Sequence, residues 1–475
     1  MNKMGIHEEC GVIGIYEPHT CDVAHNVYLG LYALQHRGQE SCGIVLCDDG
    51  VFCEAKDMGH VSDVFDEERL HSLGTGNIAI GHVRYSTTGT NSYANIQPLT
   101  VRHTNGNLAL AHNGNLVNSY ELRRSFELGG AIFRGTSDTE AMAYTIVSER
   151  LWSRSTGEAV INAMKRIKGA YSCVVMTATK LIAFRDETGF RPLCIGKTAM
   201  GGYAVASESC ALDAMGAKLI RDIRPGEVIE IGEDGIRSYT DNCNGEGSIC
   251  VFEYIYFARP DSVIEGASVH EARQRAGELL AKKHPVDADI VIGVPDSGID
   301  AALGYAKESG IPFGLGFVKN KYIGRSFIEP DSASRRDAVN IKLNVIKSNI
   351  EGKRVVMVDD SIVRGTTSEK IIRLLRQAGA HEVHMHVSAP PFRFPCYFGT
   401  DIDSPENLIA CKYKSVKEIE SSIGVDSLGY LGLSDVNCLA QTNGCGFCDG
   451  CFSGNYPVDA PQFTGKDRFE EKLHK

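Results

Sequence analysis

Two different patterns of hydrophobic and polar positions divide the chain. Residues 10 to about 235 consist of many short segments with β-branched or alternating apolar residues, separated by Gly, Asn and Thr turns. This pattern predicts β-strands, and helical spacing interrupts it at Ala24–Gln35 and Thr139–Leu151. We therefore expect an α+β arrangement for this part, with antiparallel sheets and helices packed on their faces.

From about residue 265, short apolar strands alternate with helices. Apolar runs at 287–295, 354–360 and 382–391 are separated by helical patterns at Ile299–Ser309 and Thr367–Gln377, and another helix is expected at Ala272–Lys283. Strands alternating with helices predict right-handed βαβ units around a parallel sheet. The boundary between the two parts is expected near 236–262, and the tail from about 400 reads as irregular and Cys-rich.

Composition narrows the possible partners. A chain of 475 residues is too long to fold around one compact hydrophobic core, so two or three domains are expected. The net charge of −11 argues against nucleic acid or an acidic membrane as the main partner. The chain has no run of ~20 apolar residues and no signal peptide, so a cytoplasmic location is expected. In that compartment the 16 cysteines are core residues or metal ligands rather than disulfides.

The most specific motif is VVMVDDSIVRGTTS, residues 355–368. An apolar strand ends in Asp359 and Asp360, and a turn of glycine and hydroxyl residues then leads into a helix. Open α/β sheets bind ligands at this edge, and loop N–H groups at a helix N-terminus suit a phosphate. The two carboxylates suit ribose hydroxyls or Mg²⁺. The alternative is an ordinary βα turn with an acidic N-cap.

This string closely resembles the phosphoribosyl-pyrophosphate (PRPP) motif of type I phosphoribosyltransferases. The resemblance implies an α/β domain in which Asp359 and Asp360 hold the ribose diol and one Mg²⁺ per subunit. It implies that the 5′-phosphate is bound by the loop residues Arg364, Gly365, Thr366, Thr367 and Ser368. The turn at 294–298 resembles the family's pyrophosphate loop, with Pro295 and Asp296 on PRPP and Ser297 near Mg²⁺.

A basic and aromatic segment, 317–344, lies between these two motifs. Alone it reads as a solvated loop, but beside a PRPP site it resembles the flexible hood that closes over substrate and excludes water. Lys321 and Tyr322 are expected to contact PRPP. Asn340 departs from the family, which often has an Arg there, and this departure puts one phosphate or nucleotide contact in doubt.

The first half carries five segments that together resemble the N-terminal-nucleophile glutamine amidotransferases: LYALQHRGQES (31–41), GHVRYSTTG (81–89), NIQPL (95–99), AHNGNLVN (111–118) and GTSDTE (135–140). The resemblance implies an αββα sandwich whose nucleophile is Cys10, although Cys10 alone would read as a core residue. A thiol at a free N-terminus has its own α-amine as base, so His82 and His112 are expected to be structural.

By the same resemblance, the Asn113 side chain and the Gly114 N–H form the oxyanion hole. Arg84 binds the α-carboxylate of glutamine, and Asp138 binds its α-ammonium group. This chemistry requires removal of residues 1–9, because a Cys with an upstream peptide has an amide nitrogen that is no base. Glu8-Glu9-Cys10 is similar to the junction in family members with short propeptides that are cleaved autocatalytically.

Cys445, Cys448 and Cys451 lie three residues apart in the tail, a spacing typical of metal ligands. A zinc knuckle and an uncoordinated thiol cluster are alternatives. The segments around Cys250 and Cys396 resemble the 4Fe-4S-bearing branch of the glutamine PRPP amidotransferases. The resemblance implies one cluster per subunit, with Cys445 outside it and four ligands: Cys250, Cys396, Cys448 and Cys451.

The expected domains are a propeptide (1–9), a class II glutamine amidotransferase domain (10–240), a phosphoribosyltransferase domain (262–400) and a Cys-rich segment that packs on both (401–475). The resemblance implies a pentosyltransferase with glutaminase activity that converts glutamine and PRPP to 5-phosphoribosylamine, glutamate and pyrophosphate in purine synthesis. It also implies a homotetramer inhibited by purine nucleotides. The alternatives are a PRPP-binding regulator, for which neither a DNA-binding domain nor a degenerate nucleophile is seen, and an inactive proprotein.

Overall fold

The computed structural model describes residues 10–85, 92–320, 343–400, 402 and 404–460. The expected propeptide, Lys321, Tyr322 and Asn340 lie outside these residues. All other predicted site residues are described. Within this part of the chain, no helix combines the length and apolar character needed to cross a bilayer.

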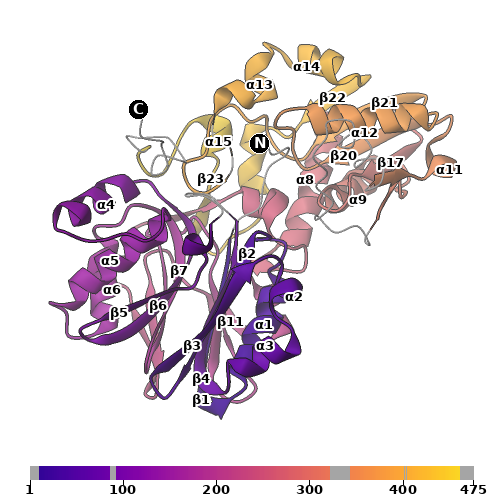
Figure 1. Ribbon diagram of the computed structural model, residues 1–475. Helices are drawn as coiled ribbons and strands as arrows, with labels where there is room; N and C mark the ends of the chain where they lie inside the picture. The colour runs from indigo at the N-terminus through magenta and orange to yellow at the C-terminus, as the bar shows by residue number, and fades with distance from the viewer. Residues whose placement is uncertain (1–9, 86–91, 321–342, 401, 403, 461–475) are drawn as a thin grey trace, which may run out of the picture.

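The first half is a sandwich of two antiparallel sheets (Figure 1). The seven-stranded sheet has the order β11-β9-β10-β1-β4-β2-β3. Its strands are β1 (Gly11–Cys21), β2 (Ser41–Asp48), β3 (Val51–Met58), β4 (Gly76–Arg84), β9 (Cys194–Lys197), β10 (Tyr203–Ala206) and β11 (Lys218–Asp222). The six-stranded sheet has the order β13-β12-β8-β7-β6-β5. Its strands are β5 (Leu99–His103), β6 (Gly106–Leu116), β7 (Gly169–Thr177), β8 (Leu181–Arg185), β12 (Val228–Gly232) and β13 (Gly235–Tyr239).

Helices cover the outer face of each sheet. The first sheet packs on α1 (Val23–Ala33), α2 (Val61–Val64) and α7 (Ser209–Ala214), with the short α3 (Glu67–Ser72) nearby. The second sheet packs on α4 (Ser119–Leu128), α5 (Asp138–Arg150) and α6 (Thr156–Met164). Because successive strand residues point to opposite faces, Ile13 joins the helix-facing core whereas Val12 joins the core between the sheets. The predicted αββα sandwich and the helices near 24–35 and 139–151 are confirmed.

The second half contains a parallel sheet of order β17-β20-β21-β22. These strands are β17 (Ile290–Gly293), β20 (Arg354–Asp359), β21 (Glu382–Val387) and β22 (Ser427–Tyr430). The main helices are α8 (Val269–Lys283), α9 (Gly298–Ser309), α12 (Thr366–Gln377) and α14 (Val416–Ile423). Helices α8 and α9 pack against each other, and α9 also contacts β17 and β20. The predicted βαβ alternation is confirmed.

The prediction of an irregular tail is wrong for part of its length. Helices α13 (Ile409–Lys412) and α14 precede β22, which extends the parallel sheet beside β21. Short apolar strands of four residues carry too little periodicity to be recognised without their neighbours. Further along, β23 (Cys445–Cys448) pairs in parallel with β14 (Gly247–Cys250), so this part of the tail returns to the junction of the two halves (Figure 1).

The remaining elements are short connections. Hairpins form between β15 (Val263–Ile264) and β16 (Ala267–Ser268), and between β18 (Phe317–Lys319) and β19 (Leu343–Val345). The segment Glu253–Phe257 is a π-helical turn, α11 is Lys347–Ile350 and α15 is Gly450–Ser453. The described residues also include 3₁₀ turns at Tyr93–Asn95, Pro405–Asn407 and Leu433–Cys438.

Candidate active sites

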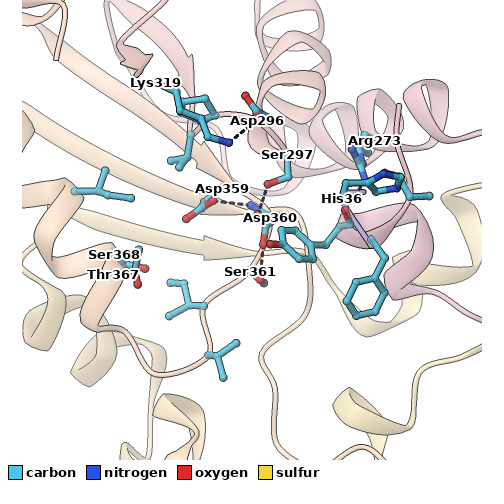
Figure 2. A pocket seen from close by; sticks show the side chains of 18 of the residues that line it. His36, Arg273, Asp296, Ser297, Lys319, Asp359, Asp360, Ser361, Thr367 and Ser368 are labelled. Carbon is cyan, nitrogen blue, oxygen red and sulfur yellow. Dashed lines mark hydrogen bonds and ion pairs between the residues drawn. The ribbon is translucent and has the colours of Figure 1, made fainter. Parts of the chain in front are cut away.

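A cavity of about 710 Å³ opens where β17 and β20 end. The turn at 294–298 and the loop at 359–368 both line it, so the two motifs separated by some sixty residues face one space. Figure 2 shows Asp359, Asp360 and Ser297 in its centre, with Thr367 and Ser368 on the side away from His36. The carboxyl edge of a parallel sheet is where such folds bind ligands.

The two carboxylates at the end of β20 are buried next to each other, and both effects disfavour their ionised forms. Burial and then the neighbouring carboxylate of Asp360 raise the pKa of Asp359 well above its usual value. Burial also raises the pKa of Asp360, although hydrogen bonds donated by Ser297 Oγ and Ser361 Oγ and the charge of Arg273 oppose the rise. A divalent cation would favour both ionised forms, so this set of hard oxygen donors fits Mg²⁺.

The loop at 364–368, which the resemblance assigns to the 5′-phosphate, has the geometry expected of an anion site. Gly365 has a φ of 83° and forms the N-cap of α12, and the three hydroxyl residues at 366–368 form the first turn of that helix. A left-handed residue before a helix turns the loop N–H groups toward the helix axis, where the dipole favours negative charge. On the other side, Lys319 Nζ lies 2.6 Å from Asp296 Oδ2 of the predicted pyrophosphate loop.

Part of the cavity wall comes from outside the parallel-sheet half. His36 and Arg37, in the loop after α1, line the cavity together with Tyr256 and Phe257 of the π-helical turn. Arg273 of α8 donates hydrogen bonds to the carbonyls of Tyr254, Tyr256 and Ala258, so it holds this wall in place. The sequence alone predicted no role for these wall residues, although His36 and Arg37 lie within 31–41, a segment that carries part of the family resemblance.

Cys10 lies at one end of the layer between the two sheets of the sandwich. Its side chain is 5% exposed, its Sγ donates to the carbonyl of Tyr85 at 3.2 Å, and the Tyr85 N–H approaches the sulfur at 3.4 Å. Strand alternation gives Cys10 the same face as Val12, and Arg84 the same face as Ile80, and both of those residues belong to the inter-sheet core. The predicted nucleophile and the predicted carboxylate ligand are therefore brought together.

Asn113 reaches the same layer from the opposite sheet. It is fully buried, and among the described residues neither its Oδ1 nor its Nδ2 has a hydrogen-bond partner. Buried amides are almost always satisfied, so this orphan amide indicates a ligand position. Gly114 has a φ of 143°, and a Cβ there would lie 2.1 Å from the carbonyl oxygen of Ala170. Only glycine fits at this position.

Asp138 begins α5, and its Oδ2 accepts a hydrogen bond from the Leu116 N–H at 2.9 Å, two residues after Gly114. The loop before it is held by Asn95 Oδ1, which accepts from the N–H groups of Thr136 and Ser137 at 2.9 and 3.1 Å. The segments at 95–99, 111–118 and 135–140 thus converge on the strand that carries Asn113.

The two histidines near this site are buried structural groups, consistent with the expectation. His82 Nε2 lies 3.0 Å from the carbonyl of His112, which links the two sheets, and burial lowers the pKa of His82 to about 3. His112 Nδ1 lies 3.2 Å from Thr139 Oγ1, and burial also lowers its pKa. Both rings are therefore neutral near pH 7.

Four thiols from distant parts of the chain gather at the junction. Cys250 and Cys448 are register partners in the β14–β23 pair, and every pair among Cys250, Cys396, Cys448 and Cys451 interacts electrostatically. Burial, with the other thiols adding, raises the pKa of Cys448 to about 12 and the pKa values of Cys250 and Cys451 well above the usual value. Soft sulfur donors of this kind suit zinc or an iron–sulfur cluster.

Cys445 belongs to a different environment. Burial and the carboxylate of Glu265 raise its pKa to about 11, whereas Arg185 opposes the rise. In the described part of the chain, no group of three or more His, Cys, Asp or Glu side chains is arranged to hold a metal ion. The four predicted cysteines are therefore neighbours that interact electrostatically, but the described residues do not form a closed set of metal ligands.

Known proteins resemble both halves and the chain as a whole. A model of the glutamine amidotransferase domain matches residues 82–214, and a model of the phosphoribosyl transferase domain matches residues 267–424. An amidophosphoribosyltransferase of Methanocaldococcus jannaschii is 47% identical over 95% of this chain and 98% of its own length. One of Bacillus subtilis is 46% identical over 97% and 96%.

A solved structure of the glutamine PRPP amidotransferase from B. subtilis, complexed with ADP and GMP, matches with a TM-score of 0.89 at 45% identity. It covers 97% of this chain and 100% of that chain. Because such relatives span nearly the whole of both chains, this chain belongs to the amidophosphoribosyltransferase family, pentosyltransferases that carry a glutamine amidotransferase domain.

Proposed function

We propose that the chain hydrolyses glutamine at Cys10 and transfers the ammonia to PRPP in the cavity at the end of the parallel sheet. The products are glutamate, 5-phosphoribosylamine and pyrophosphate, and the reaction is the committed step of purine synthesis. The observation that carries this proposal is the shared wall: residues of the loop at 36–39, adjacent to Cys10, line the cavity that holds the PRPP motif.

In the glutamine half, the thiolate of Cys10 attacks the side-chain amide carbon, the C–N bond breaks and ammonia leaves. Water then hydrolyses the thioester to glutamate, and the Cys10 α-amine carries the protons. The Asn113 amide and the Gly114 N–H stabilise the oxyanion that forms in each step. Arg84 and Asp138 bind the two charged ends of the amino acid.

In the PRPP half, ammonia attacks C1 of the ribose while the C1–O bond to pyrophosphate breaks. Loop residues 364–368 bind the 5′-phosphate, and the turn at 295–297 faces the pyrophosphate. Asp359, Asp360 and Ser297 would hold one Mg²⁺, which neutralises charge on the leaving pyrophosphate when bound. Lys321 and Tyr322, outside the described residues, would complete the site from the hood.

Cys10 must be the N-terminus for its α-amine to act as a base, so residues 1–9 are proposed to be a propeptide. We propose a glutamine amidotransferase domain at 10–240 and a phosphoribosyltransferase domain that begins at 262. Because β22 belongs to its sheet, this domain extends beyond residue 400. Intact mass of the purified protein tests this proposal. A species lacking nine residues is expected in the active fraction, and an active full-length species would contradict it.

The thiols of Cys250, Cys396, Cys448 and Cys451 are proposed to bind one 4Fe-4S cluster per subunit. A zinc ion at ~2.3 Å from each sulfur needs the thiolates close together, whereas a cluster takes one thiolate at each iron corner and separates them more widely. Iron, sulfide and zinc analysis distinguishes the two. Cys448→Ser should lose the iron, and Cys445→Ser should retain it; equal loss in both would contradict the ligand set.

The chain is also proposed to form a homotetramer that purine nucleotides inhibit. The solved structure of a family relative complexed with ADP and GMP supports nucleotide binding. Light scattering tests the tetramer. Titration with purine nucleoside monophosphates and diphosphates at fixed PRPP tests the inhibition. Unchanged pyrophosphate release at millimolar nucleotide would contradict it.

The decisive experiment compares pyrophosphate release by wild type and Cys10→Ala, with either glutamine or ammonium chloride as the nitrogen source. The variant should lose the glutamine-dependent reaction and keep the ammonia-dependent one. Cys411→Ala, which changes an exposed thiol, is the matched control. If Cys10→Ala still used glutamine, the assignment of the nucleophile would fail.

A further inference from the structure

One arginine next to the glutamine site is completely buried between the two halves of the molecule. The guanidinium of Arg37 is 0% exposed and lies in the loop after α1. Burying a charge costs several kcal/mol unless it is paired and hydrogen-bonded. A buried arginine at this position therefore points to a task that an apolar side chain could not perform.

Two carboxylates fix the orientation of this guanidinium. Glu253, at the start of the π-helical turn, accepts two hydrogen bonds from Nη1 and Nη2, each at 2.8 Å. Glu208, the N-cap of α7, accepts a third from Nη1 at 2.7 Å. Although burial alone would lower it, these carboxylates hold the pKa of Arg37 well above its usual range. The planar fork is thus charged and locked in one direction.

The Nε–H of the same guanidinium points at the nucleophile residue. Arg37 Nε donates to the carbonyl oxygen of Cys10 at 3.0 Å. Cys10 lies one residue before β1 begins at Gly11, so after removal of a propeptide it would be a chain end with a free amine. Chain ends fray unless they are held in place, whereas a nucleophile must keep its geometry to within a fraction of an ångström.

The carboxylates in turn are held by both halves. Arg191 Nη1 lies 3.3 Å from Glu253, and its Nη2 donates to the carbonyl of Phe398. Glu208 also accepts from the N–H of Arg259 and from Ser262 Oγ, and its Oε1 lies 2.7 Å from His36 Nε2. The direction of the Arg37 fork is therefore set by residues on each side of the junction.

We infer that Arg37 is a positioning residue for glutamine hydrolysis, which holds the Cys10 backbone so that its thiol and α-amine keep their alignment with the bound amide. This inference rests on the proposed role of Cys10. It assigns the buried ion pairs with Glu208 and Glu253 a kinetic task in the glutamine reaction, in addition to any contribution to stability.

The test is Arg37→Lys, which keeps the charge but has one nitrogen and cannot bridge two carboxylates and the Cys10 carbonyl. Misplacement by about 1 Å costs about 100-fold in rate, so kcat with glutamine should fall by about 10- to 100-fold. KM for glutamine should change by less than about threefold, because Arg84 and Asp138 are untouched. Ammonia-dependent activity, which reports on the cavity that Arg37 also lines, should fall much less than glutamine-dependent activity. Alkylation of Cys10 by a glutamine-shaped diazoketone should slow in parallel with kcat.

Arg185→Lys is the matched control. Arg185 is equally buried, pairs with Glu265 and donates to the backbone carbonyls of Gly189, Arg191 and Ile223, but it does not contact Cys10. Its replacement should leave the ratio of glutamine to ammonia activity unchanged. An equal fall in that ratio in both variants would show a general structural effect and overturn the inference.

A folded Arg37→Lys protein with normal glutamine kcat would also overturn it. If Arg37→Lys does not fold, the double variant Arg37→Gln/Glu253→Gln removes one charge of each sign and is measured in its place, with the same expected loss. The outcomes separate this inference from the proposed function. Glutamine hydrolysis by Cys10→Ala would defeat the proposed function, whereas a normal Arg37 variant beside an inactive Cys10→Ala would defeat only the positioning role.

Discussion

The two candidate sites are built in opposite ways. The glutamine site uses Cys10, just before β1, and the strand residues Arg84 and Asn113, which are far apart in sequence and meet in the layer between two sheets. The PRPP site uses loop residues that follow β17 and β20, and most of them belong to one run, 359–368. A site between two sheets is held on both sides by regular structure, whereas a site at a sheet edge is built from loops and has room for a larger, charged substrate.

The two sites also differ in how they would stabilise negative charge. In the glutamine site the unpaired amide of Asn113 is neutral and awaits a transient oxyanion. In the PRPP site, burial raises the pKa values of Asp359 and Asp360 and so disfavours their ionised forms, which a bound cation would favour. Changes at the two sites should therefore be separable by the choice of nitrogen source.

The largest effect is expected for Asp360→Asn. Asp360 is a proposed Mg²⁺ ligand, and loss of a metal ligand costs several kcal/mol of transition-state stabilisation, or about 1000-fold in rate. Pyrophosphate release should fall with glutamine and with ammonia alike, unlike in Cys10→Ala. Asp287→Asn, at an exposed ion pair with Arg354, is the control. Selective loss of only the glutamine reaction would break the division between the two sites.

A smaller effect is expected for Asn113→Ala. Removal of one oxyanion donor lowers kcat by about 100- to 1000-fold, and it should act only on the glutamine-dependent rate, with KM for glutamine little changed. Steady-state glutaminase assays beside ammonia-dependent assays measure this effect. Asn118→Ala, at a surface contact with Arg166, should be neutral. A change confined to KM would instead indicate that Asn113 binds ground-state substrate.

Lowering the pH should reduce the free energy of unfolding of both halves, because each half contains a buried histidine. Burial lowers the pKa of His82 and of His386 to about 3, while an unfolded histidine titrates near 6.5. Below pH 6.5 the unfolded chain gains protons that the folded chain does not, so stability is lost as pH falls from about 6.5 toward 3. At pH 5 each histidine contributes about 2 kcal/mol to this loss.

His386→Asn isolates the contribution of the second half. The difference in free energy of unfolding between wild type and this variant should shrink by about 2 kcal/mol when the pH is lowered from 7.5 to 5.0. Urea titration at each pH measures it. A constant difference between the two proteins would show that His386 is not held neutral in the folded state.

The smallest effect is expected for Gly365→Ala. A left-handed backbone costs an alanine about 1–2 kcal/mol, which should raise KM for PRPP by roughly tenfold with little change in glutaminase activity. Gly310→Ala has a similar φ of 75° in open space at the end of α9 and controls for the backbone strain, whereas a Cβ at Gly365 would also lie 2.4 Å from Ile409 Cδ1. Equal kinetic effects in both variants would mean that the strain acts on folding rather than on phosphate binding.

Sequence and structure agree best where the chemistry is contiguous. The strand–loop–helix at 354–377 was predicted almost to the residue, because an apolar strand, two carboxylates and a hydroxyl-rich turn are adjacent in the chain. The strand β22 was missed because four residues carry no periodicity of their own, and it is recognisable only beside β21.

The sequence by itself determined the two fold classes, and its motifs carry the family resemblance that implies the PRPP loop, the glutamine site and the group of four cysteines. Each of these depends on local patterning or on motifs that can be read along the chain. Only the tertiary structure decided that His36 and Arg37 line the PRPP cavity, that Asn113 is an orphan amide, and that Arg37 ties Cys10 to Glu253. Burial and hydrogen-bond partners are properties of packing between distant segments, and no local pattern encodes them.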